Sequence, residues 1–337
     1  MERTGIDGVC GRPPWSRPSW TLRGCLLCVV ATAILLTALP VESFAGGRQE
    51  AELRILYTSS LNGNLDGCAC GSTPRAGLVK RAAYLRAHRR VGDLLVDVGD
   101  VFDVTPDALL SRHILETYAE LGYAAIAVGD QDFSSGIEAL IHLRERSPLL
   151  CNNLAIRGQD GTETAFSDEP LLVNVADVTV GIAAVLDREV FLLYPQTLKN
   201  RLVLRDPAET VRRVVGDLRS RGVACVILLY HGTVESGLKV VSEVDGIDVM
   251  IVGHEQRLVA PRRVGSTIVA SPGEEGNRVG LISLRIDPRE GGVRGFTSEV
   301  VELSYLSDPD DPAVRARIDS YEQELRARIK ERPKERT

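Results

Sequence analysis

Short apolar runs alternate with amphipathic segments along the chain after residue 50. The apolar runs are rich in β-branched residues and are bounded by glycine and aspartate, which is typical of buried strands. Helical patterns between such strands imply right-handed crossovers. The predicted strands are 53–57, 94–98, 124–128, 149–152, 225–229 and 247–252, and the predicted helices are 78–90, 106–121, 136–146 and 207–221. This alternation predicts an α/β fold.

Other segments have a different pattern. Residues 171–175 and 178–185 flank Ala176-Asp177 and predict a β-hairpin. From residue 258 onward, short runs separated by turns predict antiparallel strands, at 258–264, 267–271, 279–286 and 293–305. A charged helix is expected at about 313–328. The simplest organisation is one domain over 52–305, followed by a C-terminal helix and polar tail over 306–337.

The N-terminal segment has the pattern of an export signal. Arg12, Arg17 and Arg23 precede an apolar run over 25–39, and the small residues Ser43 and Ala45 follow it. We interpret residues 1–45 as a cleaved signal peptide, so the mature protein would be exported, to a periplasmic or extracellular location. A retained membrane anchor is the alternative, although the apolar run is shorter than the ~20 residues that a span requires.

Composition narrows the range of partners. The net charge of −6, with 44% hydrophobic and 26% charged residues, is ordinary for a globular protein. A nucleic-acid partner is not expected, because such binding requires a basic face. No membrane contact is expected once the signal is cleaved, and the sequence does not identify a protein partner.

Four predicted strands are followed by side chains that bind metals. The strands ending near 98, 128, 229 and 252 lead into Asp100, Asp130, His231 and His254, and glycine precedes three of these four residues. In α/β sheets, ligands bind beyond the carboxyl ends of strands. Each residue alone is more often part of a turn or cap, but two carboxylates and two imidazoles converging in one place suit Zn, Mn or Fe.

These motifs, in this order, resemble those of a known family. From about 53 to 305 the chain resembles the calcineurin-like metallophosphoesterases, in the exported branch of periplasmic 5′-nucleotidases and cyclic phosphodiesterases, and specifically their N-terminal metal domain. The resemblance implies an α/β sandwich of two mixed sheets flanked by helices. The family's nucleotide-binding C-terminal domain has no counterpart, so nucleotide specificity does not carry over.

Two of the family's metal loops are altered. The first loop normally reads His-Thr-Asn-Asp-Leu-His-Gly, whereas residues 57–63 read Tyr-Thr-Ser-Ser-Leu-Asn-Gly, so Ser60 and Asn62 replace an aspartate and a histidine ligand. The third loop normally reads Gly-Asn-His-Glu-Phe. Here Asp130 takes the position of the asparagine ligand and Gln131 that of the catalytic histidine, so no catalytic residue is assigned.

The resemblance therefore implies one complete metal site and one weak site. The complete site comprises Asp100, Asp130, His231 and His254 and would hold one divalent transition metal (Zn, Mn or Fe). The weak site would have Ser60, Asn62 and Gln256 beside Asp100, and a neutral Ser and Asn make it a poor binder. The family's Ser-Ala-Asn strand end appears as residues 151–153, which makes Asn153 a candidate for binding phosphate.

Four cysteines follow the predicted signal, and their pairing is open. Cys68 and Cys70 lie in a Gly-flanked loop after the altered first motif and could bind a soft metal or cycle between dithiol and disulfide. They could instead form a structural disulfide, with Cys151 as a possible partner. Cys225 opens an apolar strand and is predicted to be a buried thiol.

Two functions remain open on the sequence alone. The first is an exported, metal-dependent phosphoesterase, a 5′-nucleotidase-like hydrolase acting on a small phosphate ester, weak or atypical because one metal site and the catalytic histidine are lost. The second is a non-catalytic metal-binding or thiol-redox-linked protein on the same scaffold, since a fold by itself does not fix a function.

Overall fold

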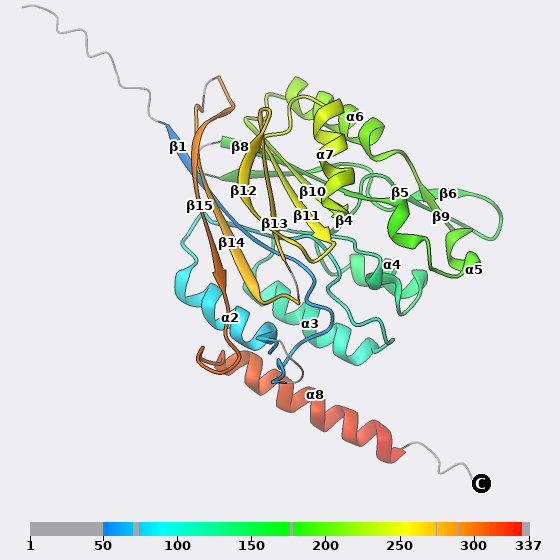
Figure 1. The fold of residues 1–337 in the computed structure, drawn as a ribbon. Helices are drawn as coiled ribbons and strands as arrows, with labels where there is room; N and C mark the ends of the chain where they lie inside the picture. Colours follow the sequence, from blue (N-terminus) through cyan, green and yellow to red (C-terminus); the bar gives the residue numbers. More distant parts are fainter. Residues whose placement is uncertain (1–49, 70–73, 176–177, 274, 289, 332–337) are drawn as a thin grey trace, which may run out of the picture. The chain divides into compact units, whose positions relative to one another are not determined.

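The computed structural model describes residues 50–69, 74–175, 178–273, 275–288 and 290–331 (Figure 1). The predicted signal peptide lies outside these residues, as do Cys70 and the polar end of the tail. Two six-stranded sheets form the centre of the described region. The first has the order β15-β14-β1-β2-β3-β4, with bounds β1 Ala51–Thr58, β2 Leu94–Asp97, β3 Ala125–Ala127, β4 Leu149–Leu150, β14 Arg278–Ile286 and β15 Val293–Glu302.

The second sheet has the order β12-β13-β11-β10-β8-β7. Its strands are β7 Leu171–Val175, β8 Val178–Leu186, β10 Cys225–Gly232, β11 Val249–His254, β12 Leu258–Val264 and β13 Thr267–Pro272. Both sheets are mixed: β1 to β4 run parallel, as do β8, β10, β11 and β13, whereas β14 with β1 and β15, β7 with β8, and β12 with β13 pair antiparallel. A small third sheet has the order β6-β5-β9, with β5 Leu154–Arg157, β6 Glu163–Ala165 and β9 Leu202–Leu204.

The two large sheets pack face to face, and helices cover their outer faces. Alternate side chains of a strand point to opposite faces, so Ile55 packs in the core between the sheets and Leu56 packs in the helical layer. The helices over the first sheet are α2 Gly77–His88, α3 Ala108–Leu121, α4 Ile137–Arg144 and α8 Pro312–Glu331. Those over the second sheet are α6 Pro207–Ser220 and α7 Val234–Glu243. Short helices η1 Gln131–Phe133, η2 Arg188–Phe191 and α5 Gln196–Lys199 lie in loops.

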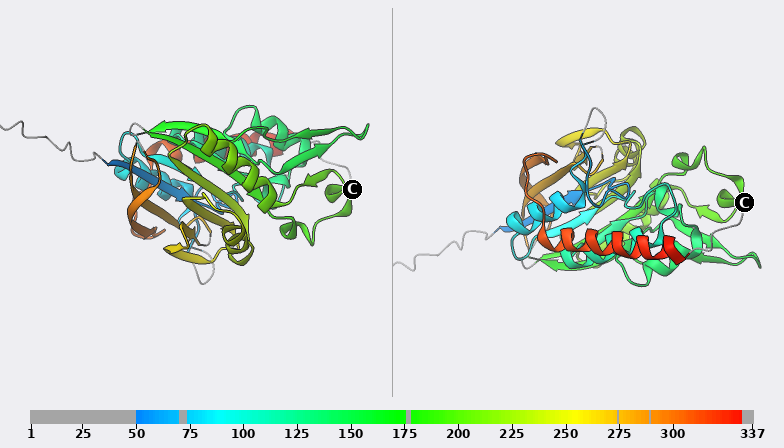
Figure 2. Two further views of the ribbon diagram at one scale, coloured as in Figure 1. Left: turned by 90° about the horizontal axis from the view of Figure 1, so that it is seen from above. Right: turned by 90° about the horizontal axis from the view of Figure 1, so that it is seen from below.

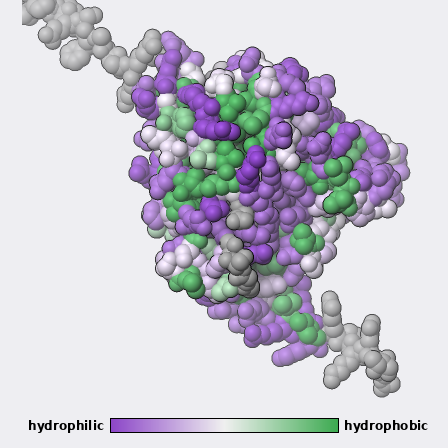
Figure 3. Space-filling view, in the orientation of Figure 1, coloured by the Kyte–Doolittle hydropathy of each residue, from purple (hydrophilic) through white to green (hydrophobic). Residues whose placement is uncertain are grey.

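The C-terminal helix α8 is attached to this scaffold. Val314 and Ile318 are buried against the helical layer, and Arg317 pairs with Glu116 and Glu120 of α3. Figure 2, seen from below, shows α8 running along that layer. The surface in Figure 3 is mainly hydrophilic with smaller apolar areas. None of the helices in the described part of the chain combines the length and hydrophobicity that a membrane span requires.

The α/β sandwich of two mixed sheets is confirmed, as is the hairpin of β7 and β8. One correction concerns the region after residue 258, which is not wholly antiparallel, because β13 also pairs parallel with β11. Helix α7 and the strands of the small sheet were not predicted from the sequence. The predicted domain boundaries stay predictions.

Candidate metal centre

Side chains from both large sheets meet at the carboxyl ends of four strands. Asp100 follows β2, Asp130 follows β3, His231 lies near the end of β10, and His254 is the last residue of β11. One ligand atom from each of these four residues lies within 4.8 Å of the others. Asp100, Asp130 and His231 are buried and His254 is half-buried. The structure therefore brings together the four residues that the sequence singled out.

Hydrogen bonds orient these side chains. His254 Nδ1 and His231 Nε2 lie 2.9 and 3.0 Å from Asp130 Oδ1, and His231 Nε2 lies 3.4 Å from Asp100 Oδ1. On its other side, the His231 ring donates from Nδ1 to the carbonyl oxygen of Val98, at 2.7 Å. A backbone acceptor of this kind fixes the tautomer and ring orientation of metal-binding histidines. Since Nδ1 is occupied, Nε2 is the atom of His231 that could bind a metal.

The electrostatics of the cluster match a cation site. Burial alone would raise the pKa of Asp130, but hydrogen bonds from His231 and His254 lower it well below its usual range. Burial alone would lower the pKa of His231, but the charges of Asp100 and Asp130 outweigh burial and raise it well above its usual value. The two carboxylates therefore favour positive charge between them. Two carboxylates and two imidazoles fit a divalent transition metal.

Glycines allow the close approach of these loops. A Cβ on Gly129 would lie 2.3 Å from Asp100 Oδ1, and a Cβ on Gly99 would lie 2.8 Å from His231 Nδ1. Gly99 also has a φ of +88°, in the left-handed region that glycine tolerates best. Side chains at either position would push the ligands apart, so these two glycines are required by the geometry of the site.

The altered first loop lies directly against this cluster. Ser60 N donates to Gly99 O and Asn62 N donates to Asp100 O, both at 2.9 Å. The Ser60 hydroxyl is 3.0 Å from the Ser59 hydroxyl. Neither Ser60 nor Asn62 offers the carboxylate or imidazole that the resemblance assigns to its position.

The Asn62 side chain faces a different set of partners. Its Nδ2 lies 3.5 Å from Glu275 Oε2, and Arg75 Nε lies 3.1 Å from the same oxygen. Asn62 Oδ1 is buried and has no partner among the described residues. Gln256, the third residue of the expected weak site, is half-buried and has a φ of +58°.

Gln131 donates hydrogen bonds to both carboxylate oxygens of Asp100. Its backbone N–H donates to Asp100 Oδ1 at 3.1 Å, and its side-chain Nε2 donates to Asp100 Oδ2 at 3.4 Å. A side-chain amide cannot give up a proton at neutral pH. At position 131 the chain therefore has a hydrogen-bond donor that is not an acid.

Asp132 supports the site and was missed from sequence. Its Oδ1 accepts hydrogen bonds from the backbone N–H groups of Val101 and Phe102, and its Oδ2 accepts one from Gly129, at 2.8–3.1 Å. These bonds connect the loop of Asp100 to the loop of Asp130. Burial, followed by the nearby charge of Asp100, raises the pKa of Asp132 to about 7. Nothing in the spacing of the sequence indicates that this carboxylate points inward.

Tyr194 was also missed. Its hydroxyl donates to Asp130 Oδ2 at 2.8 Å, on the side away from the two histidines. The ring packs edge-on against Phe191, with centroids 5.2 Å apart. Burial, and then the charge of Asp130, raise the pKa of Tyr194 well above its usual value, so the hydroxyl keeps its proton. A tyrosine in a loop 64 residues beyond Asp130 has no spacing signal in the sequence.

The side-chain amide of Asn153 is hydrogen-bonded to backbone groups. It is buried, its Nδ2 donates to the carbonyls of Leu186 and Arg205, and its Oδ1 accepts from Leu186 N. Cys151 Sγ donates to the same Oδ1 at 3.4 Å. The two N–H groups and the oxygen of the Asn153 amide thus hold the polypeptide together around β8. They are already used by the chain itself.

The possible pairing of Cys68 with Cys151 was wrong. Cys151 is a free, buried thiol whose pKa burial raises to about 12. Cys225 is also free and buried, as predicted. Cys68 is disulfide-bonded, and its backbone forms a β-bridge with Arg75. Arg75 in turn pairs with Glu275 beside Asn62, so the Cys68 segment lies next to the altered first loop.

Comparison with known proteins places this site in context. No family model matches the chain. The chain is 25% identical to the 5′-nucleotidase of Bos taurus over 311 residues, which cover 81% of the chain and 53% of that relative. It is 22% identical to the 2′,3′-cyclic-nucleotide 2′-phosphodiesterase/3′-nucleotidase of Salmonella typhimurium over 293 residues, covering 71% of the chain and 44% of that relative. The chain thus spans about half the length of these relatives.

Solved structures show the same fold. The calcineurin-like phosphoesterase YfkN from Bacillus subtilis is similar with a TM-score of 0.71 and 18% identity, over 84% of this chain and all of that one. The 5′-nucleotidase precursor from Thermus thermophilus is similar with a TM-score of 0.69 and 20% identity, over 82% of this chain and 59% of that one. The chain is therefore a sequence relative of 5′-nucleotidases and 2′,3′-cyclic-nucleotide phosphodiesterases, with the fold of the calcineurin-like phosphoesterases.

Proposed function

We propose that this chain is an exported phosphoesterase that hydrolyses small phosphate esters with one divalent transition metal, Zn, Mn or Fe. The observation that carries the proposal is the four-ligand cluster of Asp100, Asp130, His231 and His254 at the strand ends. The names of the sequence relatives, 5′-nucleotidase and cyclic-nucleotide phosphodiesterase, support phosphate esters as the substrate class. The basic and apolar N-terminal pattern supports export.

Each residue of the cluster has a separate role in the proposed function. A bound divalent metal supplies Lewis acidity at a phosphoryl oxygen and a lowered pKa of bound water. Asp100 and Asp130 provide the negative charge that holds the cation. His231 presents Nε2 because Val98 O fixes Nδ1. Tyr194 and Gln131 donate to the outer oxygens of Asp130 and Asp100 and hold both carboxylates in orientation.

Turnover should be weak and should depend on the leaving group. Gln131 cannot protonate a departing oxygen, and general acid catalysis typically supplies ~10²–10⁴-fold. The positions of Ser60 and Asn62 offer no strong ligands for a second cation. Substrates whose leaving group is already a stable anion should therefore be hydrolysed much faster than others.

The alternative is a non-catalytic metal-binding protein on this scaffold. The contact that favours it is Gln131 Nε2 to Asp100 Oδ2 at 3.4 Å, because an oxygen held by an amide is less available to a substrate or second cation. The disulfide at Cys68 beside the first loop fits a thiol-redox link. This alternative expects metal binding with no turnover.

Hydrolysis assays separate the two functions. The mature protein is incubated with Mn²⁺ or Zn²⁺ and with 4-nitrophenyl phosphate, phenyl phosphate and bis(4-nitrophenyl) phosphate. The proposal expects slow release of 4-nitrophenol from the monoester or the diester, much slower release of phenol, and loss of both in His231→Ala. Folding of the variant is checked by circular dichroism. Binding of metal without any hydrolysis would favour the alternative, and robust activity surviving His231→Ala and His254→Ala together would exclude the metal mechanism.

A further inference from the structure

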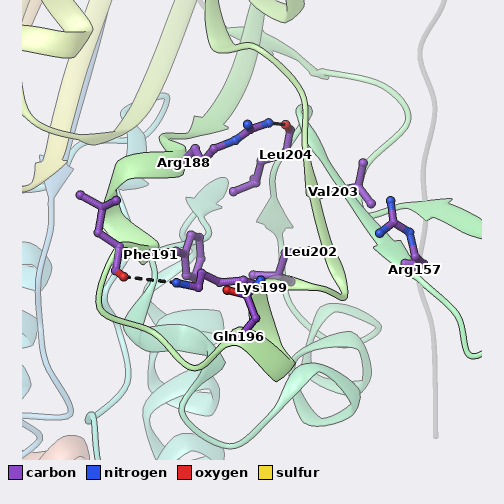
Figure 4. A pocket seen from close by; sticks show the side chains of 9 residues that line it. Arg157, Arg188, Phe191, Gln196, Lys199, Leu202, Val203 and Leu204 are labelled. Carbon is purple, nitrogen blue, oxygen red and sulfur yellow. Dashed lines mark hydrogen bonds between the residues drawn. The ribbon is translucent and has the colours of Figure 1, made fainter.

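A cavity of about 450 Å³ lies between the small sheet and the loop that follows β8. Its lining includes cationic side chains from separate elements, which Figure 4 labels. These are Arg157 at the end of β5, Arg188 at the start of η2 and Lys199 at the end of α5. Phe191, Leu202 and Leu204 supply apolar lining. The volume is within the range of small-molecule sites, about 300–1,000 Å³.

The cations are held in place by the backbone. Arg188 donates to Leu204 O at 2.8 Å, and Lys199 donates to Leu192 O at 3.2 Å. A guanidinium has five N–H donors and an ammonium has three. The hydrogen bond to the backbone carbonyl orients each group and leaves its other N–H donors available to a ligand. Arg157 pairs with Glu163, which offsets much of its charge. Arg188 and Lys199 are therefore the main cations that a ligand would meet.

The cavity is connected to the metal centre by an aromatic pair. Phe191 lines the cavity and packs against Tyr194, whose hydroxyl donates to Asp130. Phe191 also packs against Phe133, which follows Asp130 by three residues, with centroids 5.5 Å apart. A ligand in contact with Phe191 would therefore be separated from Tyr194, which donates to Asp130, by the Phe191 ring alone.

We propose that this cavity binds an organic anion with an apolar or aromatic body. Among the described residues that line it, none is acidic, and the carboxylate of Glu163 beside the lining is paired with Arg157. The lining favours a body that can be buried, because a small inorganic anion would leave the half-buried Leu202 and Val203 and the exposed Leu192 uncovered. Leu192 and Leu193 next to the cavity are 71% and 99% exposed, and Figure 3 shows apolar surface over the region of β5 and β9.

The anion could come from two sources with the same chemistry. It could be the distal part of a phosphate ester whose phosphate lies at the metal centre, or a separate small carboxylate, sulfonate or phosphate. The first source rests on the proposed function and the second does not. The binding site itself requires no turnover, so it can be tested independently of catalysis.

Fluorescence titration with 8-anilinonaphthalene-1-sulfonate tests the site. We expect one probe to bind per chain, and the neutral analogue N-phenyl-1-naphthylamine to bind at least about tenfold more weakly, because a hydrogen bond to a charged group contributes that much. Lys199→Gln and Arg188→Gln should each weaken binding of the sulfonate about five- to tenfold. Arg188→Lys should retain most of it. The matched control is Lys239→Gln, which removes an exposed cation from α7 in the opposite helical layer.

The same titration distinguishes the two sources. If 2-naphthyl phosphate displaces the probe at least tenfold more effectively from metal-loaded than from metal-free protein, the ligand spans both sites and is the distal part of a substrate. If metal has no effect on displacement, the occupant is a separate anion. Both results support the cavity as an anion site, whatever the hydrolysis assays show.

Three results would overturn the proposal. They are equal binding of the neutral analogue, unchanged affinity in both Lys199→Gln and Arg188→Gln, and an equal loss in Lys239→Gln. Thermal unfolding checks that each variant is folded. If Arg188→Gln does not fold because Leu204 O loses its donor, Lys199→Gln and the neutral analogue still decide the outcome.

Discussion

Asp100 is contacted on one side by the other three residues of the ligand cluster and on the other side by the first loop, residues 57–63. The two regions differ in the chemistry of their side chains. On one side, Asp130, His231 and His254 present oxygen and nitrogen ligands within 4.8 Å of one another. On the other side, the first loop is bonded to the carbonyls of Gly99 and Asp100 through the N–H groups of Ser60 and Asn62. Its side chains are neutral. One region offers candidate metal ligands, and the other offers only neutral side chains.

The backbone of the first loop shows that shape and ligand chemistry are separable. Ser60 and Asn62 have φ values of +50° and +52°. Asparagine adopts this region with little penalty, whereas the same conformation in serine carries a cost of order 1–3 kcal/mol that the surroundings must offset. Hydrogen bonds to Gly99 O and Asp100 O stabilise the conformation without any metal. The conformation of the loop therefore does not require a metal ligand at either position.

The largest expected effect is the contrast between His254→Ala and Ser60→Ala. Removing His254 leaves three ligands and a buried pair of carboxylates with less positive charge beside them. Mutating a residue that only supports a metal ligand lowers metal affinity by up to about 100-fold. Removing a ligand itself should therefore lower the affinity by at least about 100-fold. Removing the Ser60 hydroxyl should leave affinity unchanged. Isothermal titration with Zn²⁺ and elemental analysis measure both. Two tightly held metals in the unmodified protein would contradict the contrast.

A second change tests whether the first loop can become a metal site. Ser60→Asp, Asn62→His and Gln131→His together restore an anion, an imidazole and an acid next to Asp100, so a second metal should bind and hydrolysis of 4-nitrophenyl phosphate should rise. Stoichiometry should increase from one to two. Asn174→His on the exposed edge strand β7 controls for casual binding by a new histidine. A triple variant that binds two metals and does not hydrolyse the substrate would contradict the proposal that this chain is a phosphoesterase.

The sequence predicted more of the ligand cluster than of its support. Asp100, Asp130, His231 and His254 follow apolar runs that end at one edge of the sheets, and strand ends converge in any such fold. Tyr194 and Asp132 could not be predicted, because nothing in their spacing shows that they turn inward. The strands of the small sheet were missed because β6 is short and exposed. The helix α7 was missed although Thr233 accepts from Ser236 N as its N-cap.

Metal affinity should depend on pH through His231. In the metal-free protein the charges of Asp100 and Asp130 outweigh burial and raise the pKa of His231 well above its usual value, so at neutral pH Nε2 carries a proton as well as Nδ1. A metal binds only the neutral ring, so binding must release that proton. Affinity should therefore rise with pH, by about tenfold per unit while one proton is displaced, and level off above the folded-state pKa. Titration calorimetry at pH 6, 7 and 8 in two buffers measures the released proton. Affinity independent of pH would contradict the coupling.

The smallest expected effect concerns Tyr194→Phe, which removes the hydrogen bond to Asp130 Oδ2 and keeps the ring against Phe191. Without that donor, the Asp130 carboxylate can rotate away from the two histidines, and metal affinity should fall about tenfold, the lower end for losing a supporting partner. Stability should change little because the packing remains. Tyr305→Phe is the matched control, since the Tyr305 ring lies near Lys80 and away from the cluster. A tenfold loss in both variants would indicate a general effect of removing a hydroxyl. A loss confined to Tyr194→Phe would show that the four-ligand cluster owes part of its metal affinity to a supporting residue outside the four ligands. The first loop has no such supporting residue among its described contacts.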